Sequence, residues 1–244
     1  MEGPSVHLAA KRINRLEGQV IKKVYGNARQ PLSQLSENKI ESVRAVRKRL
    51  FLDTTGHSVV THFLMFGSYR INKRRDKPER IGIRCTHDSL NIYNGSVKVL
   101  DPESDEYRSY DQPERDVLSD EFDRECALKA MNRNTRIIAD VLLDQDIFGG
   151  VGNIIKNEVL YLTGIDPRSI SSSIPTEKAE ELVTQVIAFT KGWLDIKLQG
   201  NSLNRVIYNQ PECECGTKIE RENIGDYDRR TFYCASCQTL YKNG

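Results

Sequence analysis

The spacing of apolar residues changes twice along the chain. Between residues 6 and 16 apolar side chains recur at helical intervals, whereas from about 18 to 110 they fall in short runs separated by Gly, Asn and Asp. Runs such as VIKKVYG, SVVTHFLMFG and SVKVL predict antiparallel strands joined by turns. An acidic, proline-containing stretch at 102–119 reads as a linker. The first part is therefore expected to be an antiparallel β-sandwich with a flanking helix.

After the linker the helical period returns. It covers residues 122–131, 134–145, 154–163 and about 175–198, and capping Ser and Thr residues open the last segment. We expect an α+β protein with an N-terminal sandwich, a helical domain and a cysteine-bearing tail, divided at 1–118, 119–205 and 206–244.

Composition describes a globular chain without a dominant charge. Of 244 residues, 38% are hydrophobic and 29% are charged, and the net charge is +2. No apolar run approaches the roughly 20 residues of a membrane helix, and no signal peptide is recognised, so a cytoplasmic location without membrane contact is expected. Basic residues crowd at 44–49 and 70–80. Each run is either a solvated face or part of a phosphate-binding surface, and their density favours the second.

Six cysteines divide into two kinds. Cys85 and Cys126 are isolated and are expected to be buried apolar residues in a reducing compartment. The other four lie in the tail and form a C-x-C pair and a C-x-x-C pair around an 18-residue loop: Cys213, Cys215, Cys234 and Cys237. Four thiolates at this spacing predict a structural Zn²⁺ that folds a segment too small for its own core.

The stretch FGGVGN places glycines between two helical segments and ends on Asn153. Glycines allow a tight turn and a close backbone approach, and a helix that starts at Asn153 favours an anion at its N-terminus. An ordinary connection between two helices is the alternative. In the tail, Arg229 and Arg230 lie in the loop between the cysteine pairs, where a zinc-pinned hairpin would present them to phosphates or merely to solvent.

Together these segments resemble the formamidopyrimidine-DNA glycosylase and endonuclease VIII family of base-excision repair enzymes. The similarity covers nearly the whole chain and rests on EGP at the start, RKRLFL, THFLMFG, LLDQDIFGGVGNIIKNEVLYLTGIDP and RRTFYCASCQ. The glycine-turn segment is similar to the family's helix–two-turn–helix motif. EGP looks more like the endonuclease VIII branch, whereas the methionine in HFLMFG resembles the other branch.

The resemblance implies a monomer that binds damaged DNA between two domains and flips a damaged base out of the stack. The N-terminal amine then attacks C1′, and a Schiff base leads to β- and δ-elimination. By resemblance, Glu2 is the catalytic acid and base, Lys48 reaches the active site and a phosphate, and Met65 fills the gap left by the base. Asn153 and Arg229 match the residues that hold the phosphates.

The start of the chain departs from the family pattern. Family members usually begin Met-Pro-Glu, whereas this chain reads Met1-Glu2 and has Ser5 where a second glutamate is usual. An α-amino group has a pKa of about 7.7–8.0 against about 10.4 for lysine, so the amine of Met1 is a usable nucleophile near neutral pH. Met1 is therefore predicted to replace the proline. One alternative is that the sequence has been altered at its start. The other is that the protein has lost its catalytic activity and is a zinc-dependent binder of damaged DNA.

Overall fold

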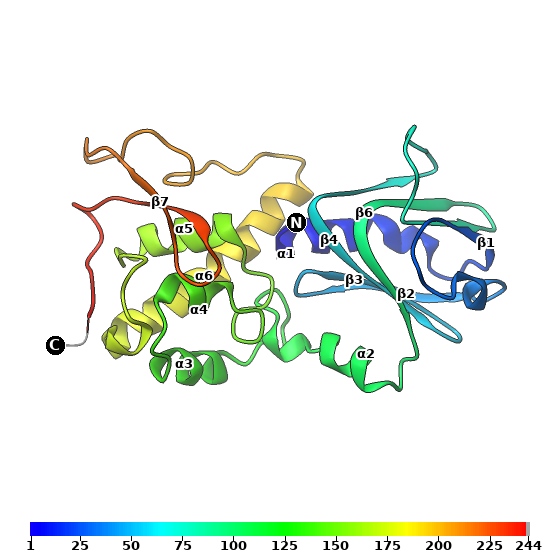
Figure 1. Cartoon of the computed structure of the whole chain (residues 1–244), viewed down its shortest axis with the longest axis horizontal. Coiled ribbons are helices and arrows are strands. Elements are labelled where there is room, and N and C mark those ends of the chain that lie inside the picture. Colours follow the sequence, from blue (N-terminus) through cyan, green and yellow to red (C-terminus); the bar gives the residue numbers. More distant parts are fainter. Residues whose placement is uncertain (243–244) are drawn as a thin grey trace. The chain divides into compact units, whose positions relative to one another are not determined.

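A computed structural model describes residues 1–242, and its contacts divide the chain into two units. Met1 and residues 3–112 form the first unit, whereas Glu2 belongs by its contacts to the second unit with the residues from Pro113 onward. The predicted α+β class is confirmed: an antiparallel sheet comes first, helices follow, and a cysteine-bearing hairpin comes last (Figure 1).

The first unit is built on one antiparallel sheet of six strands, in the order β1-β5-β6-β4-β3-β2. Helix α1 contacts β2 and β3, and its Val6, Ala9 and Ile13 are fully buried in the core of this unit. A second apolar cluster includes Phe51 and Val60. The elements are α1 (Gly3–Ile13), β1 (Ile21–Tyr25), β2 (Ile40–Val46), β3 (Arg49–Thr54), β4 (Ser58–Ile71), β5 (Ile81–Cys85) and β6 (Ser89–Leu100), with short 3-10 helices at Asn14–Leu16 and Leu32–Leu35.

The stretch expected to be a linker contains a helix, α2 (Asp105–Tyr110), and a 3-10 turn at Pro113–Arg115. The guanidinium of Arg44 binds Asp111 just after α2 and also Asp53 of β3 at 2.9 Å. Arg47 is 3% exposed. Arg44 is thus paired with acids and Arg47 is buried, so these two arginines do not contribute to the phosphate-binding surface that the basic runs were expected to form.

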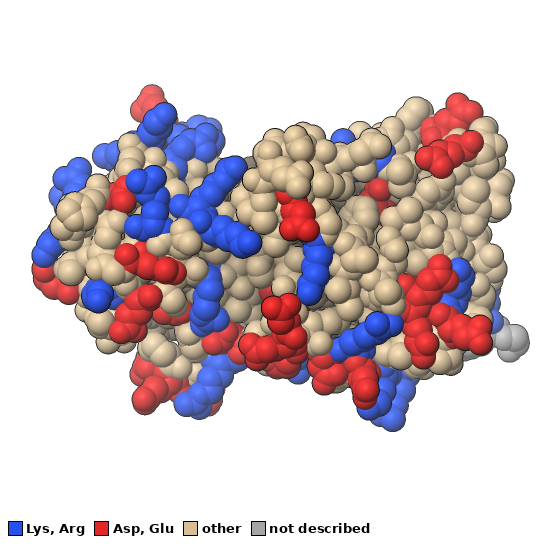
Figure 2. All heavy atoms as spheres, turned by 180° about the vertical axis from the view of Figure 1, so that it is seen from behind, with Lys and Arg blue, Asp and Glu red and all other residues tan. Residues whose placement is uncertain are grey.

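The second basic run is largely exposed. Within it, Arg74 binds Glu79 at 2.6 Å, and Arg80 donates to the backbone carbonyl of Gly95 at 3.0 Å. Figure 2 shows Lys and Arg side chains gathered over the part of the surface that the first unit forms, on the left of that view. Basic side chains are thus concentrated on one part of the first unit, although the net charge of the chain is only +2.

The second unit consists of helices around an apolar core, followed by a two-stranded hairpin. The core contains the fully buried Phe148, Ile155 and Leu182. The elements are α3 (Arg124–Asn132), α4 (Ile138–Leu143), α5 (Asn153–Leu162), a 3-10 turn at Ser171–Ser173, α6 (Thr176–Leu198), β7 (Glu220–Ile224) and β8 (Arg229–Tyr233). Cys85 is buried as expected, but Cys126 is exposed on α3, so that expectation is wrong. None of the helices described is long and apolar enough to cross a bilayer.

A buried carboxylate attaches the segment before the hairpin to α5. Glu158 is fully buried, and its two oxygens accept the backbone N–H groups of Val206, Ile207 and Tyr208 at 2.8–3.2 Å. These three backbone N–H groups lie outside helices and strands. Glu158 therefore supplies the acceptors that buried backbone donors need.

Glu158→Ala is expected to lower the free energy of unfolding by about 2–4 kcal/mol, because it leaves buried N–H groups without an acceptor. Urea denaturation followed by circular dichroism measures this change. Glu180→Ala, at an exposed position of α6, is the matched control and should stay within about 0.5 kcal/mol of wild type. Equal stability of the two variants would contradict the role of Glu158.

Candidate functional site

Glu2 lies at the N-terminus of α5. Its Oε1 accepts the backbone N–H of Ile154 at 2.7 Å, and its Oε2 accepts that of Ile155 at 3.3 Å. Unpaired N–H groups and the helix dipole make this end of a helix favourable for a carboxylate. A Cβ atom on Gly152 would lie 2.3 Å from Cγ of Glu2, so the glycine is what allows the approach. The anion at this helix end is thus the protein's own carboxylate, and the expected phosphate contact of Asn153 stays a prediction.

Met1 belongs to the first unit. Its amino group donates a hydrogen bond to the carbonyl of Phe63 at 3.3 Å. Nearby, burial lowers the pKa of His62 below its usual value, and the positive charges of Arg49, the N-terminal amine and Lys48 lower it further. Burial and three neighbouring positive charges thus both disfavour the protonated imidazole of His62. No sequence signal had drawn attention to His62.

Lys48 occupies the tight turn between β2 and β3. The preceding residue, Arg47, has a φ of 57°, a left-handed conformation that is uncommon outside glycine. Its guanidinium donates to the backbone carbonyls of Ser109 and Tyr110 at 2.9 and 3.2 Å. The buried arginine therefore stabilises an unfavourable turn conformation and fixes the position from which the half-buried Lys48 projects.

Asn153 contacts the hairpin through the backbone of Arg230 in the second unit. Asn153 is the first residue of α5, and its Nδ2 donates to the carbonyl of Arg230 at 2.9 Å. One turn later, Oδ1 of Asn157 accepts the backbone N–H of Phe232 at 2.7 Å. Arg229 begins β8 and is exposed. Two side chains of α5 thus fix strand β8, which leaves the guanidinium of Arg229 at the surface.

Lys156 is a buried cation that sequence reasoning missed. It is fully buried, and its Nζ donates to Oγ1 of Thr231 at 2.7 Å. Burial lowers its pKa to about 7, although Asp140 and Glu2 act to raise it; Arg229 lowers it further. In the sequence Lys156 stands beside Asn157 and a glutamate, a polar run that is typical of a solvated helix face. Its burial follows from the packing of the hairpin, which the local sequence does not indicate.

The four tail cysteines converge, and all four sulfur atoms lie within 4.8 Å of one another. The Sγ atoms of Cys213 and Cys237 are 3.7 Å apart, and those of Cys215 and Cys234 are 3.6 Å apart. A disulfide bond is near 2.05 Å, whereas a tetrahedron of Zn–S bonds of about 2.3 Å has edges close to the observed separations. The hydroxyl of Tyr161 on α5 lies 3.2 Å from Sγ of Cys213. The donors therefore fit a tetrahedral thiolate metal site.

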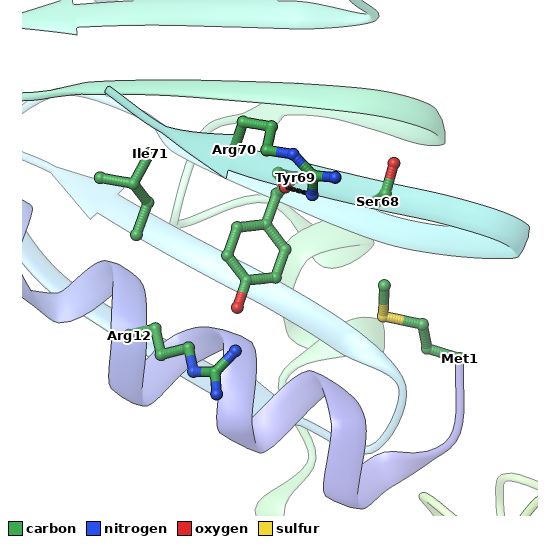
Figure 3. A pocket seen from close by; sticks show the side chains of 6 residues that line it. All are labelled: Met1, Arg12, Ser68, Tyr69, Arg70 and Ile71. Carbon is green, nitrogen blue, oxygen red and sulfur yellow. Dashed lines mark hydrogen bonds between the residues drawn. The ribbon is translucent and has the colours of Figure 1, made fainter. Parts of the chain in front are cut away.

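A pocket of about 330 Å³ opens beside Met1 in the first unit. Figure 3 shows the Met1 side chain at one end, with Arg12 of α1 facing Tyr69 of β4. Arg70 bends back so that its Nη1 donates to the carbonyl of Tyr69 at 2.9 Å. Met65 lies further back along β4 and is 73% exposed. The amine of Met1, the pocket beside it and the exposed thioether of Met65 thus all lie on or near strand β4.

Comparison with known proteins gives the family. Residues 1–102 match the formamidopyrimidine-DNA glycosylase N-terminal domain, and residues 114–203 match the H2TH domain of the same enzyme. Endonuclease 8-like 3 of Xenopus laevis is 32% identical over 85% of this chain and 36% of that protein. Endonuclease 8-like 2 of Bos taurus is 41% identical over 52% of this chain and 39% of that protein.

Solved structures share the fold. A viral DNA glycosylase superposes with a TM-score of 0.86 at 22% identity, covering 98% of this chain and all of the other. The formamidopyrimidine-DNA glycosylase of Lactococcus lactis, bound to DNA with an AP site, gives 0.84 at 20% identity, over 98% of this chain and 99% of that one.

The chain belongs to the formamidopyrimidine-DNA glycosylase and endonuclease VIII family, whose members are DNA glycosylases. It spans less than two fifths of the length of the two endonuclease 8-like relatives.

The buried lysine makes stability depend on pH. Because the pKa of Lys156 falls to about 7 on folding and is about 10.4 in an unfolded chain, the unfolded state binds more protons between these values. The free energy of unfolding contributed by this group therefore rises from pH 7 to pH 10.

Lys156→Met should flatten that rise, so its stability relative to wild type is greatest near pH 7 and declines towards pH 10. Urea denaturation across this range, under reducing conditions, measures it. Lys129→Met, at an exposed lysine of α3, should run parallel to wild type. A Lys156→Met curve that also runs parallel would show that Lys156 titrates normally.

Proposed function

We propose that the protein is a bifunctional DNA glycosylase and AP lyase that acts on oxidised bases in damaged DNA. The observation that carries this proposal is the fixed carboxylate of Glu2, which is held by the start of α5 and is joined by one peptide bond to the residue that bears the terminal amine. A general acid and base next to a nucleophile is what the reaction requires.

The proposed reaction starts from the uncharged amine of Met1. Its nitrogen attacks C1′, the bond from C1′ to the base breaks, and the base leaves with the bonding electrons. Glu2 takes a proton from the new ammonium and passes it to O4′, which opens the sugar ring and leaves a protonated imine. Loss of a proton from C2′ then breaks the C3′–O bond, and the 3′ phosphate leaves.

Side chains of both units are proposed to hold the DNA backbone. Lys48 at its hairpin turn, and Asn153 and Arg229 in the second unit, would each contact a phosphate. An exposed guanidinium on a strand fixed at its backbone supports this role for Arg229. Met65, which is exposed on β4, would occupy the space that the extruded base leaves.

The metal is proposed to be Zn²⁺, bound by the thiolates of Cys213, Cys215, Cys234 and Cys237. Sulfur ligands in a closed tetrahedral set are typical of structural zinc. The ion would hold the two ends of the hairpin together and take no part in the chemistry. Contacts from α5 support the rest of the hairpin. The protein is proposed to act as a monomer with one Zn²⁺.

An abasic site is the substrate on which the proposal is tested. The Lactococcus lactis enzyme is described in complex with such DNA, and an aldehyde at C1′ bypasses base recognition. With borohydride, wild-type protein should form a covalent adduct on the first residue, identified by intact mass and peptide mapping. The same mass spectra show whether the first residue of the purified protein is Met1.

Glu2→Gln should reduce release of an oxidised base from duplex DNA by at least about 100-fold, because the amide cannot carry the proton that opens the sugar ring. Affinity for DNA with a stable abasic analogue should change by less than about threefold. Wild-type base release by Glu2→Gln would remove Glu2 from the mechanism. If wild-type protein binds DNA with a natural abasic site but borohydride traps no adduct, the protein is a damaged-DNA binder that has lost its nucleophile.

Arg229→Ala should weaken binding to every DNA alike and reduce the salt dependence of binding by about one phosphate contact. The matched control is Arg230→Ala, also exposed, which should retain most of the affinity and the wild-type slope. Fluorescence anisotropy at several salt concentrations measures both. Loss confined to one lesion, or equal loss in the two variants, would contradict the role of Arg229.

A further inference from the structure

The pocket beside Met1 is lined from two elements of the first unit. Helix α1 contributes Arg12. Strand β4 contributes four consecutive residues, Ser68, Tyr69, Arg70 and Ile71. Figure 3 shows the Met1 side chain at one end and the guanidinium of Arg12 pointing toward the hydroxyl of Tyr69. A volume of about 330 Å³ lies at the lower end of the range for small-molecule sites, which suits a ligand of the size of a nucleobase.

The pocket carries positive charge and no acid. Residues 3–16, which include α1, and residues 54–75, which include β4, contain no Asp or Glu. Arg12 and Arg70 are exposed, and a guanidinium stays protonated throughout the pH range in which proteins work. A third guanidinium lies at the rim, where Nη1 of Arg75 donates to Oγ of Ser68 at 3.0 Å. An anion is therefore the ligand that this pocket favours.

Two hydrogen-bond donors in the pocket are available to a ligand. Arg70 is partly used, because its Nη1 donates to the carbonyl of Tyr69 at 2.9 Å. Within residues 1–242, by contrast, the guanidinium of Arg12 and the hydroxyl of Tyr69 have no hydrogen-bond or ion-pair partner in the protein. The charged donor and the neutral donor that face each other in Figure 3 can therefore both bind a ligand.

Phe63 connects these donors to the terminal amine. Its carbonyl accepts the hydrogen bond from the amino group of Met1 at 3.3 Å, and its ring packs against that of Tyr69 with centroids 6.2 Å apart. Phe63 is 1% exposed, so both contacts are anchored in the core. A substrate that the amine attacks is thus held close to the pocket that Arg12 and Tyr69 line.

We propose that this pocket receives the base that the amine of Met1 displaces and stabilises it as an anion, with Arg12 as the charged donor. The proposal rests on the proposed function and adds the group that stabilises the departing base. When the bond from C1′ to the base breaks, both electrons pass to the ring nitrogen, and the charge spreads to the carbonyl oxygens of the base. No carboxylic acid lines the pocket to protonate that nitrogen, so guanidinium and hydroxyl donors stabilise the charge. The released base then takes a proton from water.

The donors also indicate the class of base. A guanidinium offers only donors, so it pairs with carbonyl oxygens and is poorly matched to exocyclic amino groups. Oxidised pyrimidines with two ring carbonyl groups, such as 5-hydroxyuracil and thymine glycol, meet this requirement. They are the substrates that we expect the protein to release.

The test measures base release and strand cleavage separately, with the full chain in single turnover. One duplex carries 5-hydroxyuracil, thymine glycol or a preformed abasic site at the same position. Arg12→Gln should slow release of both bases by at least about 10-fold, and more for thymine glycol, because its saturated ring spreads negative charge less well. Arg12→Lys keeps the charge and should retain most of the rate. Cleavage at the abasic site, where no base leaves, should change by less than about twofold in both variants.

Lys11→Gln is the matched control, because it removes a neighbouring exposed charge of α1 that does not line the pocket, and it should release both bases at the wild-type rate. Arg12 is exposed, so thermal unfolding of its variants should match wild type. Base release by Arg12→Gln at the wild-type rate overturns the leaving-group role. An equal loss at the abasic site also overturns it, because Arg12 would then be a general DNA contact.

The abasic duplex separates this proposal from the proposed function. Wild-type protein that cleaves the abasic site but releases neither pyrimidine overturns the assignment of the base class. Wild-type protein that neither cleaves the abasic site nor releases a base contradicts the proposed function itself.

Discussion

The hydrogen bonds between the Glu2 carboxylate and the start of α5 are the constraint on which the candidate chemistry depends. A second residue of a chain normally has few contacts and little order. Here two backbone N–H groups and a side-chain-free glycine fix its position. The N-terminus of a helix is a common binding site for ligand anions, and in this protein it binds the carboxylate of Glu2, the proposed general acid and base. An ordered carboxylate then restricts the residue before it, which bears the amine.

Helix α5 fixes more than Glu2, because its polar face is buried rather than solvated. Along ten residues it supplies side-chain partners to the hairpin, to the segment before the hairpin and to a cysteine sulfur: Asn153, Lys156, Asn157, Glu158 and Tyr161. The buried polar groups of Lys156, Asn157 and Glu158 have partners, so the cost of burying them is offset, whereas Oδ1 of Asn153 is buried without one. The hairpin is consequently held along its length by α5 and at its ends by the cysteine cluster.

Local sequence patterns predicted the elements well and their long-range partners poorly. The helical period located α5 and α6, and two cysteine pairs located the cluster, because these signals are short-range. Lys156 was missed because its burial depends on Thr231, 75 residues away. Cys126 was expected inside, but its position on α3 faces solvent. The 102–119 stretch looked like a linker because its helix is short and pairs its acids with a distant strand.

Ion pairs within the protein explain why its net charge does not indicate which kind of molecule it binds. Arg44 and Arg74 are matched by carboxylates of Asp53, Asp111 and Glu79, so they add little to the field at the surface. By contrast, residues 54–75, which include β4, contain no acid. Screening limits the field of an exposed charge to about 8–10 Å at physiological salt. A chain with a net charge of +2 can therefore present a basic surface on its first unit, where Lys and Arg side chains gather (Figure 2).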